Sequence, residues 1–191
     1  MATSVYDGFF SILLVQIAIS YWHQRKYDET LVWARRALEV DPKHVLAVQL
    51  INHVYMKIGD VHRFAAWVVS QTSQAIAWGF PEERVAAIKQ VIADMQQVYA
   101  TAGLSGVKRF WVDQITNPQL DFDALLKMAF FRAPLYGNAG RLDEAFDYLD
   151  QAIALRDPAL VHLAVAPEWD SLRGDPRFAE RLRSMQLSYS A

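Results

Sequence analysis

A tyrosine recurs near the end of successive helical patterns, and this spacing constrains the fold more than any other feature of the chain. The four tyrosines are Tyr21, Tyr55, Tyr99 and Tyr136, separated by 34, 44 and 37 residues. Three of them are followed four residues later by a glycine, at Gly59, Gly103 and Gly140. A period of this length is typical of arrays in which each unit is one helix-turn-helix pair. We therefore expect an all-α chain that forms a right-handed α-solenoid.

The turns and helix ends divide the chain into about four helix pairs within a single domain spanning residues 1–191. The expected units are 8–41, 42–78, 82–117 and 121–157, followed by a helical cap at 158–187. Asp41-Pro42 and Asp157-Pro158 mark two of the boundaries, because proline fits the first position of a helix and aspartate caps it. Asp175 is expected to cap the last helix in the same way. Small residues are expected at close helix contacts, namely Ala18, Ala37, Ala133 and Ala152.

Composition excludes several classes of function. The formal charge of −2 gives no basic face for direct binding of nucleic acid. The absence of cysteine removes thiolate chemistry and cysteine-based zinc sites, and leaves a cytoplasmic location as the default expectation. The apolar run at residues 9–19 is too short to span a membrane. We expect no metal, no cofactor and no membrane association.

The spacing of tyrosines, alanines and glycines resembles the tetratricopeptide repeat, over most of the chain. The tail from Asp157-Pro158 through Pro167-Glu168-Trp169 to Asp175-Pro176-Arg177-Phe178 resembles the C-terminal repeat region of certain bacterial regulators. The N-terminal part of those regulators is a winged-helix DNA-binding domain, an adenylate cyclase or a Ser/Thr kinase. Because this chain contains no such effector domain, the resemblance implies only a sensory or scaffolding module used in signalling.

In this repeat the first helix of each pair lines the concave side, so counting from Tyr21 predicts the residues of a groove. The predicted groove binds a peptide or helix of a partner protein, and it is apolar at one end and polar further on. Its residues are Ile12, Val15, Ile19, Trp22, His23, Gln49, His53, Met56, Lys57, Gln90, Ala93, Gln97, Lys127 and Phe130.

No catalytic constellation is visible, and we expect the protein not to be an enzyme. The five histidines lack metal-site spacing, and Asp143-Glu144 begins a helix, where acidic residues are stabilised by the helix dipole. Two alternatives to a scaffold remain open. One is a detached sensory region of a bacterial regulator. The other is a small-molecule-binding protein or enzyme that uses the same groove, with His53 as base.

The first helix breaks the rule that the end of a solenoid has a polar outer face. Apolar residues occupy nearly all of its circumference, which is typical of a buried helix. We therefore predict self-association, as a homodimer, through residues 5–22. The predicted oligomer interface consists of Phe9, Phe10, Leu13, Leu14 and Ile17.

Overall fold

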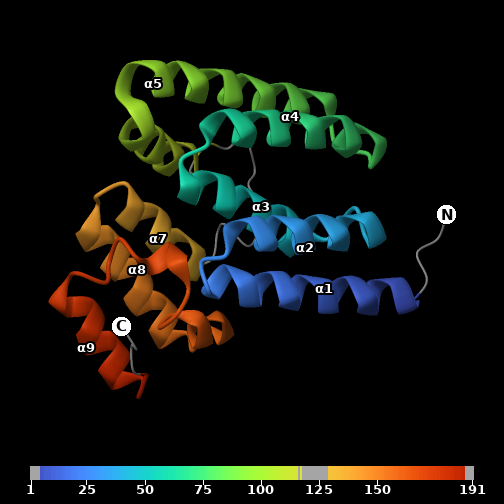
Figure 1. Ribbon diagram of the computed structural model, residues 1–191. Helices are drawn as coiled ribbons and strands as arrows, with labels where there is room; N and C mark the ends of the chain where they lie inside the picture. Colours follow the sequence, from blue (N-terminus) through green and yellow to red (C-terminus); the bar gives the residue numbers. More distant parts are fainter. Residues whose placement is uncertain (1–4, 116, 118–128, 188–191) are drawn as a thin grey trace. The chain divides into compact units, whose positions relative to one another are not determined.

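The computed structural model describes residues 5–115, 117 and 129–187, and every secondary-structure element in that part of the chain is a helix (Figure 1). The predicted all-α class is confirmed for these residues. In chain order the α-helices are α1 (Val5–His23), α2 (Tyr27–Val40), α3 (Val45–Ile58), α4 (Val61–Ala77), α5 (Glu82–Ile115), α7 (Ala129–Asn138), α8 (Leu142–Ala154) and α9 (Pro176–Ser184). Two 3-10 helices, η1 (Pro158–His162) and η2 (Pro167–Trp169), lie between α8 and α9.

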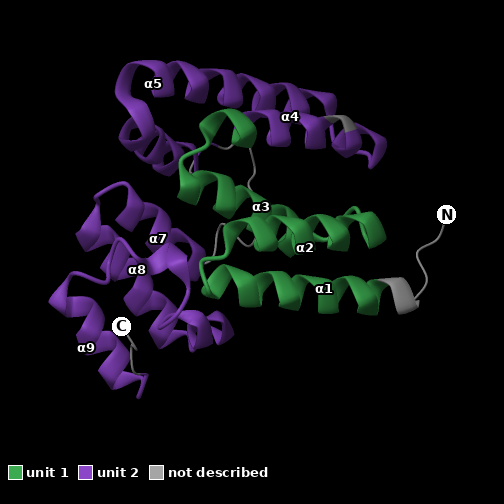
Figure 2. Ribbon diagram, in the orientation of Figure 1, with its two compact units in different colours: residues 1–64 green, residues 65–191 purple. Residues whose placement is uncertain are grey.

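The chain divides into two compact units, residues 1–64 and 65–191, with the boundary inside α4 (Figure 2). Each unit has an apolar core of its own. The arrangement of all four helix pairs as one solenoid, within one domain, stays a prediction.

Small residues allow the helices of unit 1 to pack closely. Ala18 on α1 and Ala37 on α2 are fully buried, as predicted, and Ala34 joins them. Leu14, Val15, Ala37 and Ala47 form a core cluster that links α1, α2 and α3. Helices with alanine at the contact can approach closely because no long side chain separates the two backbones.

The turn after α3 shows how the recurring tyrosine and glycine act together. Gly59 has a φ of 75°, which is the left-handed conformation that glycine adopts without steric penalty. The N–H of Gly59 donates to the carbonyl of Met56 at 3.3 Å, and the N–H of Asp60 donates to the carbonyl of Tyr55 at 2.9 Å. This pair of hydrogen bonds is the Schellman motif that ends many helices. The tyrosine therefore supplies the carbonyl on which the helix end closes.

The same closure ends α1 and α7. The N–H of Lys26 donates to Tyr21 at 3.0 Å, and the N–H of Arg141 donates to Tyr136 at 3.0 Å. The left-handed residue is Gly140 after α7, with a φ of 81°, and Arg25 after α1, with a φ of 60°. Arg25 thus takes the conformation of the missing glycine, which costs an L-residue about 1–2 kcal/mol.

The helix pair expected at residues 82–117 departs from this pattern. α5 is bent at Gly103, whose φ of 61° and ψ of −163° lie outside both the helical and the left-handed helical regions (Figure 1). The expected helix pair at 82–117 is therefore one long helix broken at a single residue, and helix resumes directly after Gly103. Tyr21 and Tyr99 are half-buried, whereas Tyr55 and Tyr136 are buried, so the environments of the four tyrosines are not equivalent.

The start of α3 also differs from the prediction. Asp41 was expected to cap a helix beginning at Pro42, but the helix begins at Val45 with His44 in the cap position. The Asp41 carboxylate instead accepts from the backbone N–H of Lys43 at 3.0 Å. A carboxylate bound two residues further along makes an Asx turn, which holds the chain out of the helix here.

The core of unit 2 lies between α7, α8 and the tail. Trp169 is fully buried, with its ring 5.1 Å from that of Phe130 and 6.2 Å from that of Phe178. Ala133 on α7 and Ala152 on α8 are fully buried, as predicted. The tail is thus part of the core and does not merely cover the end of it.

Arginine side chains on α9 form hydrogen bonds with carboxylates on α8. Asp175 accepts from the backbone N–H of Arg177 at 2.9 Å, which confirms the predicted cap of the last helix. The Arg177 side chain also binds Asp175, and these hydrogen bonds hold the pKa of the Asp175 carboxyl below its ordinary value. Arg177 donates to Asp143 at 2.7 Å, and its guanidinium lies 4.2 Å from the centre of the Phe146 ring.

A substitution at Gly137 tests the packing of the tail on α7. A Cβ at Gly137 would lie 2.9 Å from both the Leu172 side chain and the Ser171 hydroxyl. Because Leu172 is fully buried, we expect Gly137→Ala to lower the free energy of unfolding by about 1–3 kcal/mol in urea denaturation. Gly174→Ala is the matched control, since a Cβ there meets nothing within 4 Å. Equal denaturation midpoints for the two variants would contradict this packing.

Candidate protein-interaction site

The buried side of α1 is a narrow stripe that fixes the helix in unit 1. Ser11, Val15, Ala18 and Trp22 recur at spacings of four, three and four, and their exposed fractions are all between 0 and 2%. This spacing places them on one face of a helix. The hydroxyl of Ser11 donates to the carbonyl of Gly8 at 2.9 Å, so this buried polar group is satisfied within the helix.

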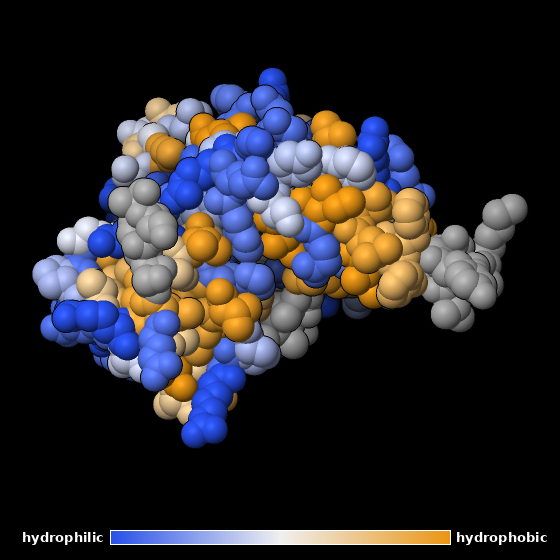
Figure 3. Space-filling model, turned by 60° about the horizontal axis from the view of Figure 1, so that its bottom comes forward, coloured by the Kyte–Doolittle hydropathy of each residue, from blue (hydrophilic) through white to orange (hydrophobic). Residues whose placement is uncertain are grey.

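The opposite side of α1 carries large apolar side chains that the other helices of unit 1 leave exposed. We define the outer face as Phe9, Phe10, Leu13 and Ile17, whose exposed fractions are 64, 53, 46 and 37%. Figure 3 shows that apolar side chains gather on the face of the molecule that it presents. Leu14, which was predicted to belong to the same interface, is only 6% exposed and faces the core instead.

The predicted groove residues of unit 1 fall into two groups. Those that remain accessible are Ile12, which is exposed, and Ile19, His23, Gln49, His53, Met56 and Lys57, which are half-buried. Val15 and Trp22 are buried, so the prediction that they line an accessible groove is wrong for this structure. The reason is that α1 turns these two side chains toward its neighbouring helices.

Trp22 is held between α2 and α3. Its ring centre lies 5.5 Å from that of Tyr27 and 6.2 Å from that of His53, which stacks on it at an interplanar angle of 30°. Trp22 is therefore a core residue, and the ring of His53 stacks on it.

The remaining groove residues lie on unit 2. Gln90, Ala93 and Gln97 are exposed on α5. Phe130 is 3% exposed and packs in the core against Trp169, so its assignment to the groove is wrong. Lys127 lies outside the described residues.

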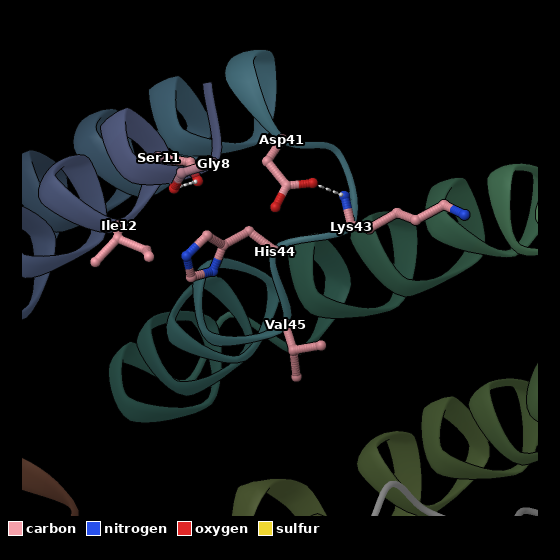
Figure 4. Close-up of a pocket in the computed structure, with 7 residues that line it drawn as sticks. All are labelled: Gly8, Ser11, Ile12, Asp41, Lys43, His44 and Val45. Atoms are coloured by element: carbon pink, nitrogen blue, oxygen red, sulfur yellow. Dashed lines mark hydrogen bonds between the residues drawn. The ribbon is translucent and has the colours of Figure 1, made fainter. Parts of the chain in front are cut away.

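A pocket that the sequence did not predict lies where α1 meets the connection from α2 to α3. It has a volume of about 350 Å³ and is lined by Gly8, Ser11, Ile12, Asp41, Lys43, His44 and Val45 (Figure 4). The Nδ1 atom of His44 is buried and has no hydrogen-bond partner among the described residues. The only sequence signal for this pocket was the Asp41-Pro42 helix boundary, which we interpreted as a cap.

Neither a metal-binding cluster nor a membrane-spanning helix is present among the described residues. They contain no group of three or more His, Cys, Asp or Glu residues placed to hold a metal ion. No helix of the described chain is long and apolar enough to cross a membrane. His53, the base of the alternative enzyme hypothesis, does not line the pocket at His44.

Comparison of the chain with models of protein families, with curated proteins and with solved structures found no match.

If Trp22 lined a groove, its replacement would change the stability of the fold little. Its burial predicts a large loss of stability instead. Truncation of a buried tryptophan leaves a large cavity, so we expect Trp22→Ala to lower the free energy of unfolding by about 3–5 kcal/mol. Ile12→Ala, at an exposed position on the same helix, is the control and should change it little. Urea denaturation followed by circular dichroism measures both. An unchanged midpoint for Trp22→Ala would restore the groove assignment.

Proposed function

We propose that this protein is a non-catalytic protein-interaction module that holds a helix of a partner protein against the outer face of α1. The observation that carries the proposal is the exposure of Phe9, Phe10, Leu13 and Ile17 on one side of a helix whose other side is buried. Exposed apolar patches of this size often mark sites of protein association.

The geometry of α1 favours a helical partner. The backbone N–H and C=O groups inside a helix are already bonded to one another, so they offer no hydrogen bonds to an extended peptide. Binding must then come from side-chain packing, and an amphipathic helix presents a matching apolar stripe. The outer face and its flank at Ile12 expose on the order of 500 Å² of apolar surface, worth on the order of 10 kcal/mol before the cost of association.

The resemblance to tetratricopeptide proteins supports the same proposal, because scaffolding is the role that it implies. The resemblance of residues 157–178 to bacterial regulators supports a place for this module in signalling. Direct binding of nucleic acid is not part of the proposal, since the formal charge of the chain is −2.

A library of helical peptides displayed on phage tests the proposal. The library is selected on the wild-type chain, and the best peptide is synthesised and titrated by calorimetry. We expect Leu13→Lys to weaken its binding by at least about tenfold, because a lysine would be buried against apolar side chains. Val32→Lys on α2 is the matched control, since Val32 is 48% exposed and lies off the outer face.

The proposal fails if no peptide is enriched, or if the enriched peptide binds Leu13→Lys as tightly as it binds the wild type. Circular dichroism and thermal melting of each variant establish that the fold is retained, which the 46% exposure of Leu13 leads us to expect.

A further inference from the structure

We infer that the helix bound by the outer face is α1 of a second copy of this chain, packed antiparallel to the first. The inference rests on the proposed function, because it names the partner for the same face. Three features support it: the pattern of residues along α1, the area of the outer face and the charges near the end of α1.

Two residues of the outer face, together with two exposed polar residues beside it, have the spacing that two packed helices require. Phe9, Leu13, Gln16 and Ser20 recur at intervals of four, three and four residues, and all four are exposed. This is the a/d spacing with which helices interlock side by side. No charged residue occurs between residues 8 and 22, so a second copy meets no buried charge along this length.

Ser20, one of the two polar residues among these four, can be covered by a second helix without losing its hydrogen bond. The hydroxyl of Ser20 donates to the carbonyl of Gln16 at 3.0 Å, so it keeps its hydrogen bond when water is excluded. A covered hydroxyl without such a partner would destabilise the pair.

The area of the face sets the strength of the pair. Two copies that each cover at most about 500 Å² bury at most about 1,000 Å² in total, which is the lower limit for a specific interface. We therefore expect a reversible dimer that forms at micromolar concentrations. An apolar patch of about 500 Å² is also near the upper end of the largest patches that monomeric proteins expose.

The charge near the end of α1 selects the antiparallel orientation. The turn after α1 carries Arg25 and Lys26, both exposed. A parallel pair would bring two such basic turns together, whereas an antiparallel pair separates them by the length of the helix. Antiparallel packing also aligns opposite ends of the two helix dipoles.

Side-chain size points to the same orientation. In the antiparallel register Phe9 lies opposite Ser20 of the second copy, and Leu13 lies opposite Gln16. The largest of the four side chains thus faces the smallest, while Leu13 and Gln16 are similar in size, and this lets the two helices interlock. In the parallel register Phe9 would face its own copy and Ser20 would face Ser20.

Analytical ultracentrifugation of the intact chain, over about 1 to 100 µM, tests the pairing. We expect the wild type and Val32→Lys to dimerise alike and Leu13→Lys to dissociate at least about tenfold more readily. A wild-type chain that stays monomeric throughout would overturn the inference. So would a dimer that Leu13→Lys leaves intact, because the copies would then join through another face.

Single-cysteine variants test the orientation, since the chain has no cysteine of its own. A mixture of Phe9→Cys and Ser20→Cys chains of different mass should oxidise to the mixed disulfide, while neither variant alone forms one efficiently. Efficient oxidation of Ser20→Cys with itself would contradict the antiparallel register. A monomeric chain that still binds a selected peptide through Leu13 would refute the second copy as partner and leave the proposed function standing.

Discussion

The hydrogen bond from the residue after each left-handed turn to the tyrosine carbonyl is the interaction on which the helix pairs depend. It ends α1, α3 and α7 at a fixed distance from the tyrosine, and the next helix begins within a few residues. A chain reversed in so short a turn must pack the second helix against the first. Buried alanines such as Ala18 and Ala37 make that packing possible.

Features that depend on neighbouring residues in the chain could be predicted from the sequence. The turn at Gly59 and the cap at Asp175 are local chemistry, and both are present. The side of a helix that its neighbours cover is a tertiary property, and counting from the tyrosines did not determine it. Trp22 was therefore placed in a groove, although it lies beneath His53. The pocket at His44 was missed because an Asx turn has the same sequence signature as a helix cap.

α1 connects the fold to the proposed function. A helix that is apolar on every side gives no signal of which side is buried, and the structure resolves this by covering the side that carries Ser11 and Val15. The outer face is left with Phe9 and Leu13 in water, which disfavours an isolated chain. We propose that association is the means by which this helix completes its burial, and the proposed scaffold function rests on that proposal.

Amide hydrogen exchange tests most directly whether the turns close on the tyrosines. The amides of Lys26, Asp60 and Arg141 donate to tyrosine carbonyls and should exchange slowly, close to the rate of global unfolding. The amides of Asp28 and Asp143 lie in the first turn of the following helices, where the helix supplies no acceptor, and should exchange much faster. Exchange of Lys26, Asp60 and Arg141 as fast as that of Asp28 and Asp143 would contradict the shared turn from which the helix pairs are derived.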